Sequence, residues 1–153
     1  MVLTCMDTRL PPLALLGLRL GDAHVLRNAG GRVTPDVVRS LVLSTWTMGT
    51  RRIAVVHHTD CGLLEGSPGE AARRIRAGGG PDYVPIPLLG FDDLDRSVAT
   101  DVAAIRGERA LPRDLQVRGY VADVATGDLR EVDVDERGRV RADDPMTQAP
   151  PDG

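Results

Sequence analysis

The first 58 residues alternate short apolar runs with stretches of helical character. Residues 2–5, 23–27 and 52–58 predict β-strands, and the last run is apolar enough to be buried on both faces of a sheet. Residues 11–18 predict a short helix between the first two strands. Residues 34–48 predict a longer helix, because Thr as N-cap, Pro at the first helical position and an acid in the first turn favour a helix start.

The pattern is less regular in the second half of the chain. Residues 68–77 predict a helix with an Arg-rich exposed side, and residues 77–90 contain so much Gly and Pro that we expect an irregular loop. Apolar residues at helical spacing predict a packed helix over 92–106. Residues 115–124 then predict a fourth strand, and residues 129–134 an antiparallel edge strand that follows a turn.

Together these elements predict an α/β fold with a mostly parallel sheet, because short strand–helix–strand units form right-handed crossovers. We expect a strand order of about 2-1-3-4, an antiparallel edge strand and flanking helices. A chain of 153 residues is long enough for one core. We assign the domain to residues 1–134 and expect the charged, Pro-rich residues 135–153 to form a flexible C-terminal tail.

Charge and hydropathy exclude several classes of partner. A net charge of -3 argues against a protein that binds nucleic acid through a basic face. No apolar run approaches the roughly 20 residues that a membrane-spanning helix needs. The N-terminus has no charged stretch followed by an apolar signal core. We therefore expect a cytoplasmic protein with no nucleic-acid or membrane partner.

The two cysteines of the chain lie at the ends of predicted strands: Cys5 is the last residue of the first, and Cys61 comes three residues after the third. In a 2-1-3 order the first and third strands are neighbours, so Cys5 and Cys61 meet at their carboxyl ends, where open α/β sheets place their sites. His58 precedes Cys61 in the spacing H-x-x-C. Two thiolates and one imidazole favour zinc and leave a fourth position for water. A Cys5–Cys61 disulfide is the alternative, but it leaves the nearby Asp, Arg and His unexplained.

Polar residues beside these three add candidate chemistry. Asp7 and Arg9 lie on the same side as Cys5 if the strand continues that far. Asp7 could orient a zinc-bound water or bind the ion itself, and Arg9 could hold Asp7 off the metal; an ordinary surface ion pair is the alternative. We interpret His57 as a packed or hydrogen-bonded neighbour of His58, and Asp60 as a turn or capping residue.

Three motifs resemble the β-class carbonic anhydrases, in the short prokaryotic branch of that family. They are Cys-x-Asp-x-Arg at 5–9, Arg-Asn-Ala-Gly at 27–30 and His-Thr-Asp-Cys-Gly at 58–62. The resemblance runs from Val2 to about Val134 and is weakest between residues 64 and 90. It implies one Zn²⁺ per chain and a catalytic dyad. The implied metal ligands are Cys5, His58 and Cys61, and the implied dyad is Asp7 and Arg9.

The activity that this resemblance implies is that of a lyase, the reversible hydration of CO2 to bicarbonate and a proton by zinc-bound hydroxide. It also implies a homodimer or a dimer of dimers. Two alternatives stay open: a hydrolase of carbonyl sulfide or carbon disulfide on the same fold, and a non-catalytic zinc-binding protein. Family members usually carry a helical N-terminal arm that embraces the partner, whereas Met1 lies four residues before Cys5; without an arm we expect a weaker dimer.

Overall fold

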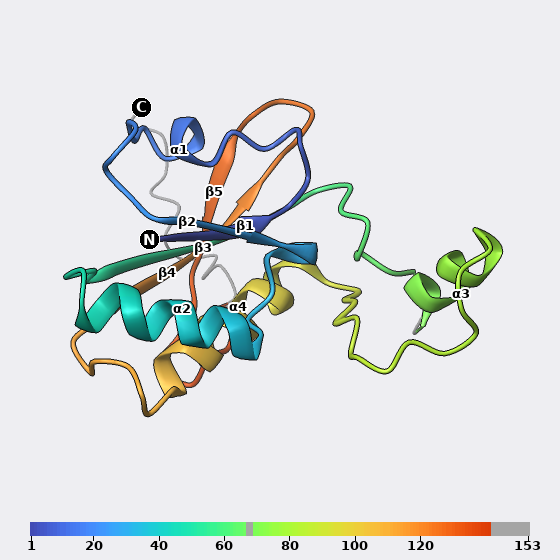
Figure 1. The fold of residues 1–153 in the computed structure, drawn as a ribbon. Helices are drawn as coiled ribbons and strands as arrows, with labels where there is room; N and C mark the ends of the chain where they lie inside the picture. Colours follow the sequence, from blue (N-terminus) through green and yellow to red (C-terminus); the bar gives the residue numbers. More distant parts are fainter. Residues whose placement is uncertain (67–68, 142–153) are drawn as a thin grey trace, which may run out of the picture.

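A computed structural model describes residues 1–66 and 69–141 of the chain. Its centre is a five-stranded sheet with the order β2-β1-β3-β4-β5 (Figure 1). The first four strands run parallel, and β5 pairs with β4 in the antiparallel direction. The predicted α/β class, strand order and antiparallel edge are therefore confirmed. The strands are β1 (Val2–Cys5), β2 (Val25–Asn28), β3 (Arg52–His58), β4 (Gln116–Ala122) and β5 (Leu129–Val132).

Helices cover the two faces of the sheet unequally. Figure 1 shows α2 and α4 packed against one face and the short α1 over the other, while α3 stands away from the sheet. The helices are α1 (Pro12–Leu15), the 3-10 helix η1 (Ala29–Gly31), α2 (Pro35–Trp46), α3 (Glu70–Ala77) and α4 (Leu94–Gly107). Among the described residues, no helix combines the length and the apolar character that crossing a membrane requires.

Helix α2 begins as its sequence predicts. The side chain of Thr34 accepts a hydrogen bond from the backbone N–H of Val37 at 3.4 Å, and Pro35 occupies the first helical position. This cap satisfies one of the N–H groups that have no partner inside the helix. The helix ends at Trp46, slightly before the predicted end at 48, and Gly49 follows in the left-handed region with φ of 75°.

The buried apolar side chains form two clusters. The cluster under α2 and α4 includes Leu3, Leu41, Val55 and Val98, all fully buried. Helix α4 can approach β4 closely because Gly119 has no side chain: a Cβ there would lie 2.2 Å from a methyl carbon of Val98. The second cluster contains both cysteines together with Val2, Leu10, Val56, Phe91 and Ala122.

Element boundaries differ from the predictions where tertiary pairing decides them. Helix α1 is shorter than the predicted 11–18, and Gly17 follows it with φ of 65°. Strand β2 starts at Val25 and extends to Asn28, because it pairs in register with β1 from Val2 to Cys5. Of the predicted tail, residues 135–141 form a turn with a bridge between Val134 and Val140, whereas residues 142–153 lie outside the described part of the chain.

Candidate metal centre

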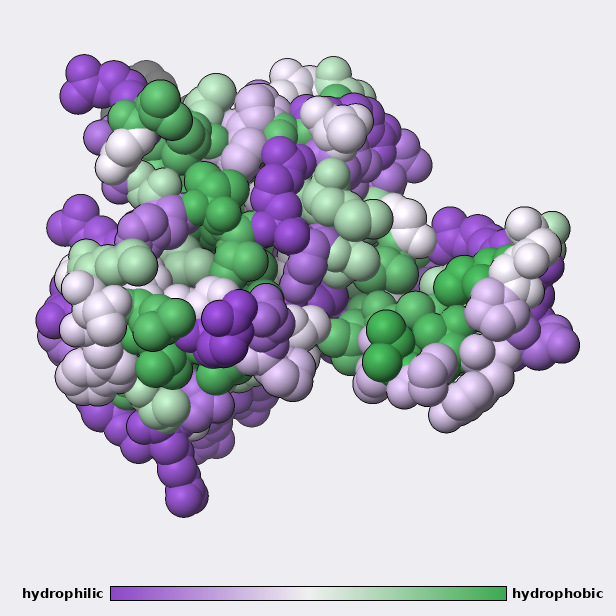
Figure 2. Space-filling model, in the orientation of Figure 1, coloured by the Kyte–Doolittle hydropathy of each residue, from purple (hydrophilic) through white to green (hydrophobic). Residues whose placement is uncertain are grey.

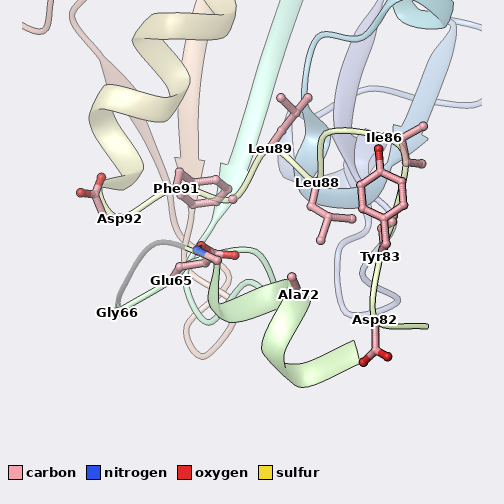
Figure 3. Close-up of a pocket in the computed structure, with 13 residues that line it drawn as sticks. Glu65, Gly66, Ala72, Asp82, Tyr83, Ile86, Leu88, Leu89, Phe91 and Asp92 are labelled. Atoms are coloured by element: carbon pink, nitrogen blue, oxygen red, sulfur yellow. The ribbon is translucent and has the colours of Figure 1, made fainter. Parts of the chain in front are cut away.

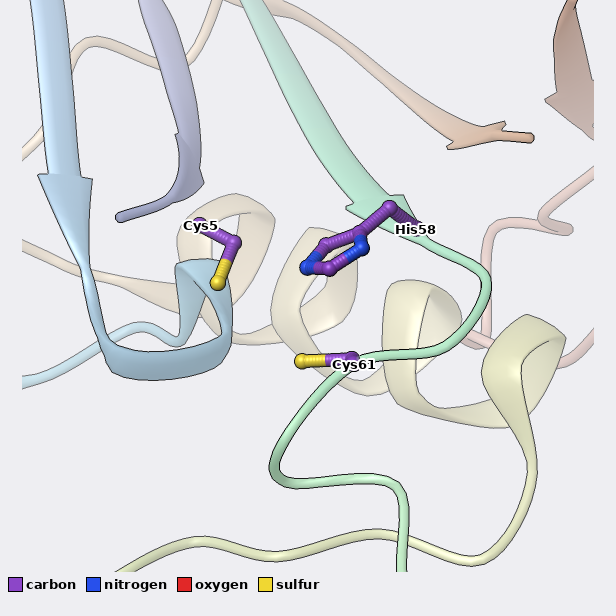
Figure 4. A group of neighbouring side chains, drawn as sticks. All are labelled: Cys5, His58 and Cys61. Atoms are coloured by element: carbon purple, nitrogen blue, oxygen red, sulfur yellow. The ribbon is translucent and has the colours of Figure 1, made fainter. Parts of the chain in front are cut away.

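Three potential ligands converge at the carboxyl ends of β1 and β3. Cys5 is the last residue of β1, His58 is the last residue of β3, and a turn brings Cys61 back towards both. Their ligand atoms all lie within 4.8 Å of one another, and all three residues are buried (Figure 4). Both cysteines are free thiols, so the structure does not have the alternative disulfide. The group has the composition and spacing that a metal ion needs.

The imidazole of His58 is oriented for ligation. Its Nδ1 atom donates a hydrogen bond to the backbone carbonyl of Thr59 at 2.8 Å, since a carbonyl oxygen can only accept. The proton on Nδ1 leaves a lone pair on Nε2, which is buried and has no hydrogen-bond partner among the described residues. Burying a polar atom without a partner costs free energy. A cation between Nε2 and the two sulfurs would remove this cost.

The sulfur of Cys5 lies near several hydrogen-bonding groups. The pKa of this thiol is lowered, first by a hydrogen bond from Cys61 and further by His58 and by the backbone N–H groups of Asp7 and Gly30. In the same contact the pKa of Cys61 is raised, first by the hydrogen bond with Cys5 and then by burial. The two thiols therefore compete for one negative charge. A divalent cation would stabilise both as thiolates.

Electrostatic effects at His58 oppose each other. Burial disfavours the charged imidazolium and lowers the pKa of His58, but the neighbouring Cys5 sulfur and the carbonyl of Thr59 favour it, and the net shift is upward. A proton and a metal cation compete for the same Nε2 lone pair. Metal binding at this site is therefore expected to release protons.

Asp7 and Arg9 form a bidentate pair next to the ligand group. Arg9 Nε donates to Oδ1 of Asp7 at 3.0 Å and Nη2 donates to Oδ2 at 2.7 Å. The backbone N–H of Arg9 also donates to Oδ1, at 2.9 Å. These contacts hold the pKa of Asp7 well below its usual range, with the Arg9 side chain as the largest cause. The carboxylate stays ionised and its two oxygens are fixed in direction.

The reason for this proximity differs from the one we predicted. Strand β1 ends at Cys5, so the condition that the strand continues to Arg9 is not met. A turn at residues 7–9 brings the pair together instead, through the backbone hydrogen bond from Arg9 to the Asp7 carboxylate. A side chain that can accept from the N–H two residues on favours such turns, and this is the sequence signal for the geometry.

Asp60 has a role that the sequence interpretation missed. It lies in the turn before Cys61 as predicted, with φ of 53°. Its carboxylate also accepts a hydrogen bond from Nη1 of Arg9 at 2.7 Å, and its carbonyl accepts from Nη2 at 3.1 Å. The two carboxylates, from opposite sides of the site, therefore fix the Arg9 guanidinium. Only the approach of β1 to β3 reveals this contact, because Asp60 is 51 residues from Arg9.

His57 does not point at the ligands. Its side chain is fully buried on the α4 side, where Nδ1 shares a hydrogen bond of 2.7 Å with the hydroxyl of Ser97. The ring stacks on Phe91 with centroids 5.6 Å apart. The prediction of a packed, hydrogen-bonded neighbour is thus confirmed. Alternation along β3 sends the two histidines to opposite faces.

Comparison with known proteins now identifies the family. A family model described as "Carbonic anhydrase" matches residues 1–75. β-Carbonic anhydrase 1 of Mycobacterium tuberculosis is 40% identical over 133 residues, which are 86% of this chain and 80% of that protein. A carbon disulfide hydrolase of Acidianus sp. is 38% identical, with 85% and 75% covered. The crystal structure of a carbonic anhydrase from Streptococcus mutans superposes with a TM-score of 0.79 at 45% identity, covering 86% and 80% of the two chains. The chain belongs to the β-carbonic anhydrase family.

Proposed function

We propose that this protein is a carbonate dehydratase that reversibly hydrates CO2 to bicarbonate and a proton with one Zn²⁺ ion per chain. The observation that carries the proposal is the buried group of Cys5, His58 and Cys61, with its unpartnered Nε2 atom, directly beside an ionised Asp7. The catalytic activity named for the relatives at 40% and 45% identity supports the same conclusion.

The choice of zinc rests on the chemistry of the ligands. Thiolate sulfur and imidazole nitrogen are the donors that zinc sites use, and three protein ligands leave one position for a water or a substrate. When bound, zinc supplies a Lewis acid that lowers the pKa of a water towards the neutral range. The two thiolates cancel the charge of the cation, so we expect the help of neighbouring residues to matter here.

In this proposal Asp7 and Arg9 form the catalytic dyad. Asp7 accepts a hydrogen bond from the attacking water and thereby orients its oxygen towards CO2. Arg9 occupies both oxygens of Asp7 at 3.0 and 2.7 Å, and this contact favours a form in which the carboxylate stays off the metal. Asp60 restrains Arg9 from the other side. The apolar side chains of Leu10, Val56 and Phe91 around the cysteines limit access of other polar groups.

Stopped-flow CO2 hydration with zinc-loaded protein tests the proposal. We expect rates well above the uncatalysed reaction, with kcat/KM in the range of roughly 10⁴–10⁸ M⁻¹ s⁻¹. Asp7→Asn should retain stoichiometric zinc and lose about 10²–10⁴-fold in turnover, because a proton acceptor is removed. Cys61→Ser should lose the zinc itself.

An exposed carboxylate elsewhere provides the control. Asp36 on the first turn of α2 is exposed and pairs with Arg39, three residues on, at 2.9 Å, so Asp36→Asn should keep both zinc and activity. A zinc-loaded wild-type protein that hydrates CO2 no faster than buffer, or an Asp7→Asn variant with full turnover, would contradict the proposed mechanism.

A second candidate activity is hydrolysis of carbon disulfide or carbonyl sulfide at the same site. The relatives at 38% identity in Acidianus sp. and 34% in Acidithiobacillus thiooxidans, both named carbon disulfide hydrolase, favour it. Both substrates are linear relatives of CO2. Sulfide release measured beside CO2 hydration on the same zinc-loaded sample separates the activities. Full zinc occupancy with neither activity would instead favour a non-catalytic zinc-binding protein.

We also propose that the chain assembles with further copies of itself, as a homodimer or a dimer of dimers, in the cytoplasm. Figure 1 shows α3 projecting from the body, and a groove of about 640 Å³ runs along its base. In Figure 3 one wall of this groove comes from Glu65 and α3 and the other from residues 82–92. Tyr83 and Ile86 are 77% and 66% exposed there, and Figure 2 shows hydrophobic surface in this region.

The two reduced thiols support the proposed cytoplasmic location, because the cytoplasm is a reducing compartment.

A further inference from the structure

Asp101 is a carboxylate buried behind the proposed metal centre, on α4. Its side chain is 4% exposed. Oδ2 accepts a hydrogen bond from Nε of Arg32 at 2.6 Å, and Oδ1 accepts one from the backbone N–H of Val33 at 3.0 Å. Oδ2 also lies 3.2 Å from Nε2 of His57, although this contact does not have hydrogen-bond geometry. One carboxylate thus contacts both the segment after η1 and the end of β3.

Arg32 extends these contacts to the Cys5 side of the centre. Its backbone N–H donates to Oδ1 of Asn28 at 2.9 Å, and its carbonyl accepts from Nδ2 of Asn28 at 2.8 Å. These two bonds close the loop that contains η1. In that loop Gly31 is so close to β1 that a Cβ would lie 3.0 Å from the backbone nitrogen of Cys5. The position of Arg32 is therefore coupled to the backbone that carries Cys5.

Arg32 also reaches the segment on the far side of the centre. Nη1 donates to the carbonyl of Leu89 at 2.7 Å, and the guanidinium carbon lies 5.5 Å from the ring centroid of Phe91. Phe91 packs in the apolar cluster that contains both cysteines, and the ring of His57 stacks on it. The guanidinium group therefore joins the loop that contains η1 to residues 89–91 and to Asp101 on α4.

His57 links Asp101 to His58, another ligand of the proposed metal centre. It precedes His58 in β3, and its ring is held between Ser97, Asp101 and Phe91. Because adjacent residues in a strand share their backbone, fixing the His57 ring also fixes the direction in which His58 leaves the strand. Nothing in the proposed reaction uses His57, Arg32 or Asp101 directly.

We propose that Asp101 is a positioning residue for the metal centre, acting through Arg32 on the Cys5 loop and through His57 on His58. This inference rests on the metal centre proposed above. Groups that hold the ligands of a metal typically change its affinity by about 10–100-fold when they are replaced. If the buried ion pair had a purely structural role, replacing Asp101 would instead lower the stability of the whole fold and leave the geometry of the ligands unchanged.

Cobalt substitution distinguishes these roles, because the absorption bands of Co²⁺ bound to thiolates depend on the ligand geometry. We expect Asp101→Asn to shift these bands and to release the metal to excess chelator about 10–100-fold faster than the wild type, at a temperature where the variant is folded. Val102→Ala is the matched control. Val102 is a fully buried neighbour on α4 that packs in the other apolar cluster, which contains neither cysteine, so this variant should lose stability but keep the bands and the release rate.

Arg32→Lys keeps the positive charge but cannot donate to Asp101 and to the Leu89 carbonyl with the same planar fork. It should reproduce the shifted bands and the faster release, and it carries the test alone if Asp101→Asn does not fold. Wild-type bands and release rates in both variants, or in Arg32→Lys alone when Asp101→Asn does not fold, would overturn the positioning role but leave the metal centre intact. A wild-type protein that binds neither Co²⁺ nor Zn²⁺ would overturn the metal centre itself, and this inference with it.

Discussion

Gly31 allows the loop after β2 to lie directly against the backbone of β1. It has φ of 69°, and a Cβ on it would lie 2.9 Å from the carbonyl carbon of Thr4. Left-handed backbone conformations are unfavourable for residues with a side chain, at about 1–2 kcal/mol each. The close approach adds a second requirement, because the atoms in the way belong to the backbone and cannot rotate aside. A residue with no side chain therefore sets the distance between this loop and Cys5.

Replacing Gly31 should affect the metal as well as the fold. We expect Gly31→Ala to lower the affinity for zinc at least about 10-fold, in the range typical of changes to groups that hold metal ligands. Gly49→Ala is the matched control, since Gly49 has φ of 75° but open space around its Cβ position. It should show the conformational cost alone and bind zinc like the wild type. Competition with a chromophoric chelator measures both affinities, and equal losses in the two variants would contradict this explanation.

The ligands could be predicted from sequence, whereas the residues that hold them could not. Cys5 and His58 end apolar strand patterns and Cys61 follows the second of these by three residues, so the strand order brings the three together. Asp60 and Asp101 are ordinary residues for a turn and for a helix, and their partners are 51 and 69 residues away in the chain. Their contacts depend on the packing of α4 and β3, which no local pattern records. The roles of the ligands and of the dyad stay predictions.

At the scale of elements, hydrogen bonds hold a short turn that follows β5 against α4. In residues 135–139 the carboxylate of Asp135 accepts from the backbone N–H groups of Arg137 and Arg139, both at 2.8 Å, and from Nε of Arg139 at 3.0 Å. The carbonyls of Val134 and Asp135 both accept from Arg106 on α4, at 3.1 Å. The turn closes the chain against the last turn of that helix.

This turn should make stability depend on pH. The pKa of Asp135 is lowered, chiefly by the backbone N–H of Arg139. A carboxyl group with a depressed folded-state pKa contributes stability above its unfolded pKa of about 4 and loses that contribution as pH falls through the lower folded value. Asp135→Asn should therefore be less stable than the wild type at neutral pH, and the difference should shrink in acid.

Urea unfolding at several pH values, with chelator in every sample, measures this difference. Asp133→Asn is the control, because the Asp133 side chain is 66% exposed and lies 3.9 Å from Arg141. It should change stability little at any pH. A difference between Asp135→Asn and the wild type that stays constant down to low pH would show that the ionised carboxylate is not the stabilising group.

Local signals in the sequence were enough to predict the helices and strands, but only some of their boundaries. The Thr34 cap and Pro35 fix the start of α2 within a few residues of chain, so sequence suffices there. The ends of β2 depend on its register with β1, and the length of α1 depends on where the chain turns at Gly17. Long-range pairing decides such boundaries.

At the scale of the whole molecule, the proposed assembly predicts that the groove beside α3 is covered by a second copy. Ile86→Glu places a charge on this apolar surface and should convert the assembly to monomers, because an unpaired charge is costly to bury in an interface. Met48→Glu is the control, since Met48 is 63% exposed, close to the 66% of Ile86, but is not part of this groove. Sedimentation velocity measures the mass. A wild-type monomer, or an Ile86→Glu variant that stays assembled, would contradict the proposed surface.

The parallel pairing of β1 with β3 also has a consequence for folding kinetics. Cys5 and Cys61 are 56 residues apart in the chain, and only the register that sets Val2 beside Ala54 and Thr4 beside Val56 brings them together. Contacts between distant segments form slowly, because the entropy of closing the intervening loop must be overcome first. His58 and Cys61 alone offer an ion only two ligands. Tight capture of metal by a refolding chain should therefore coincide with the formation of the central sheet, so the rate of metal uptake should report when β1 and β3 pair.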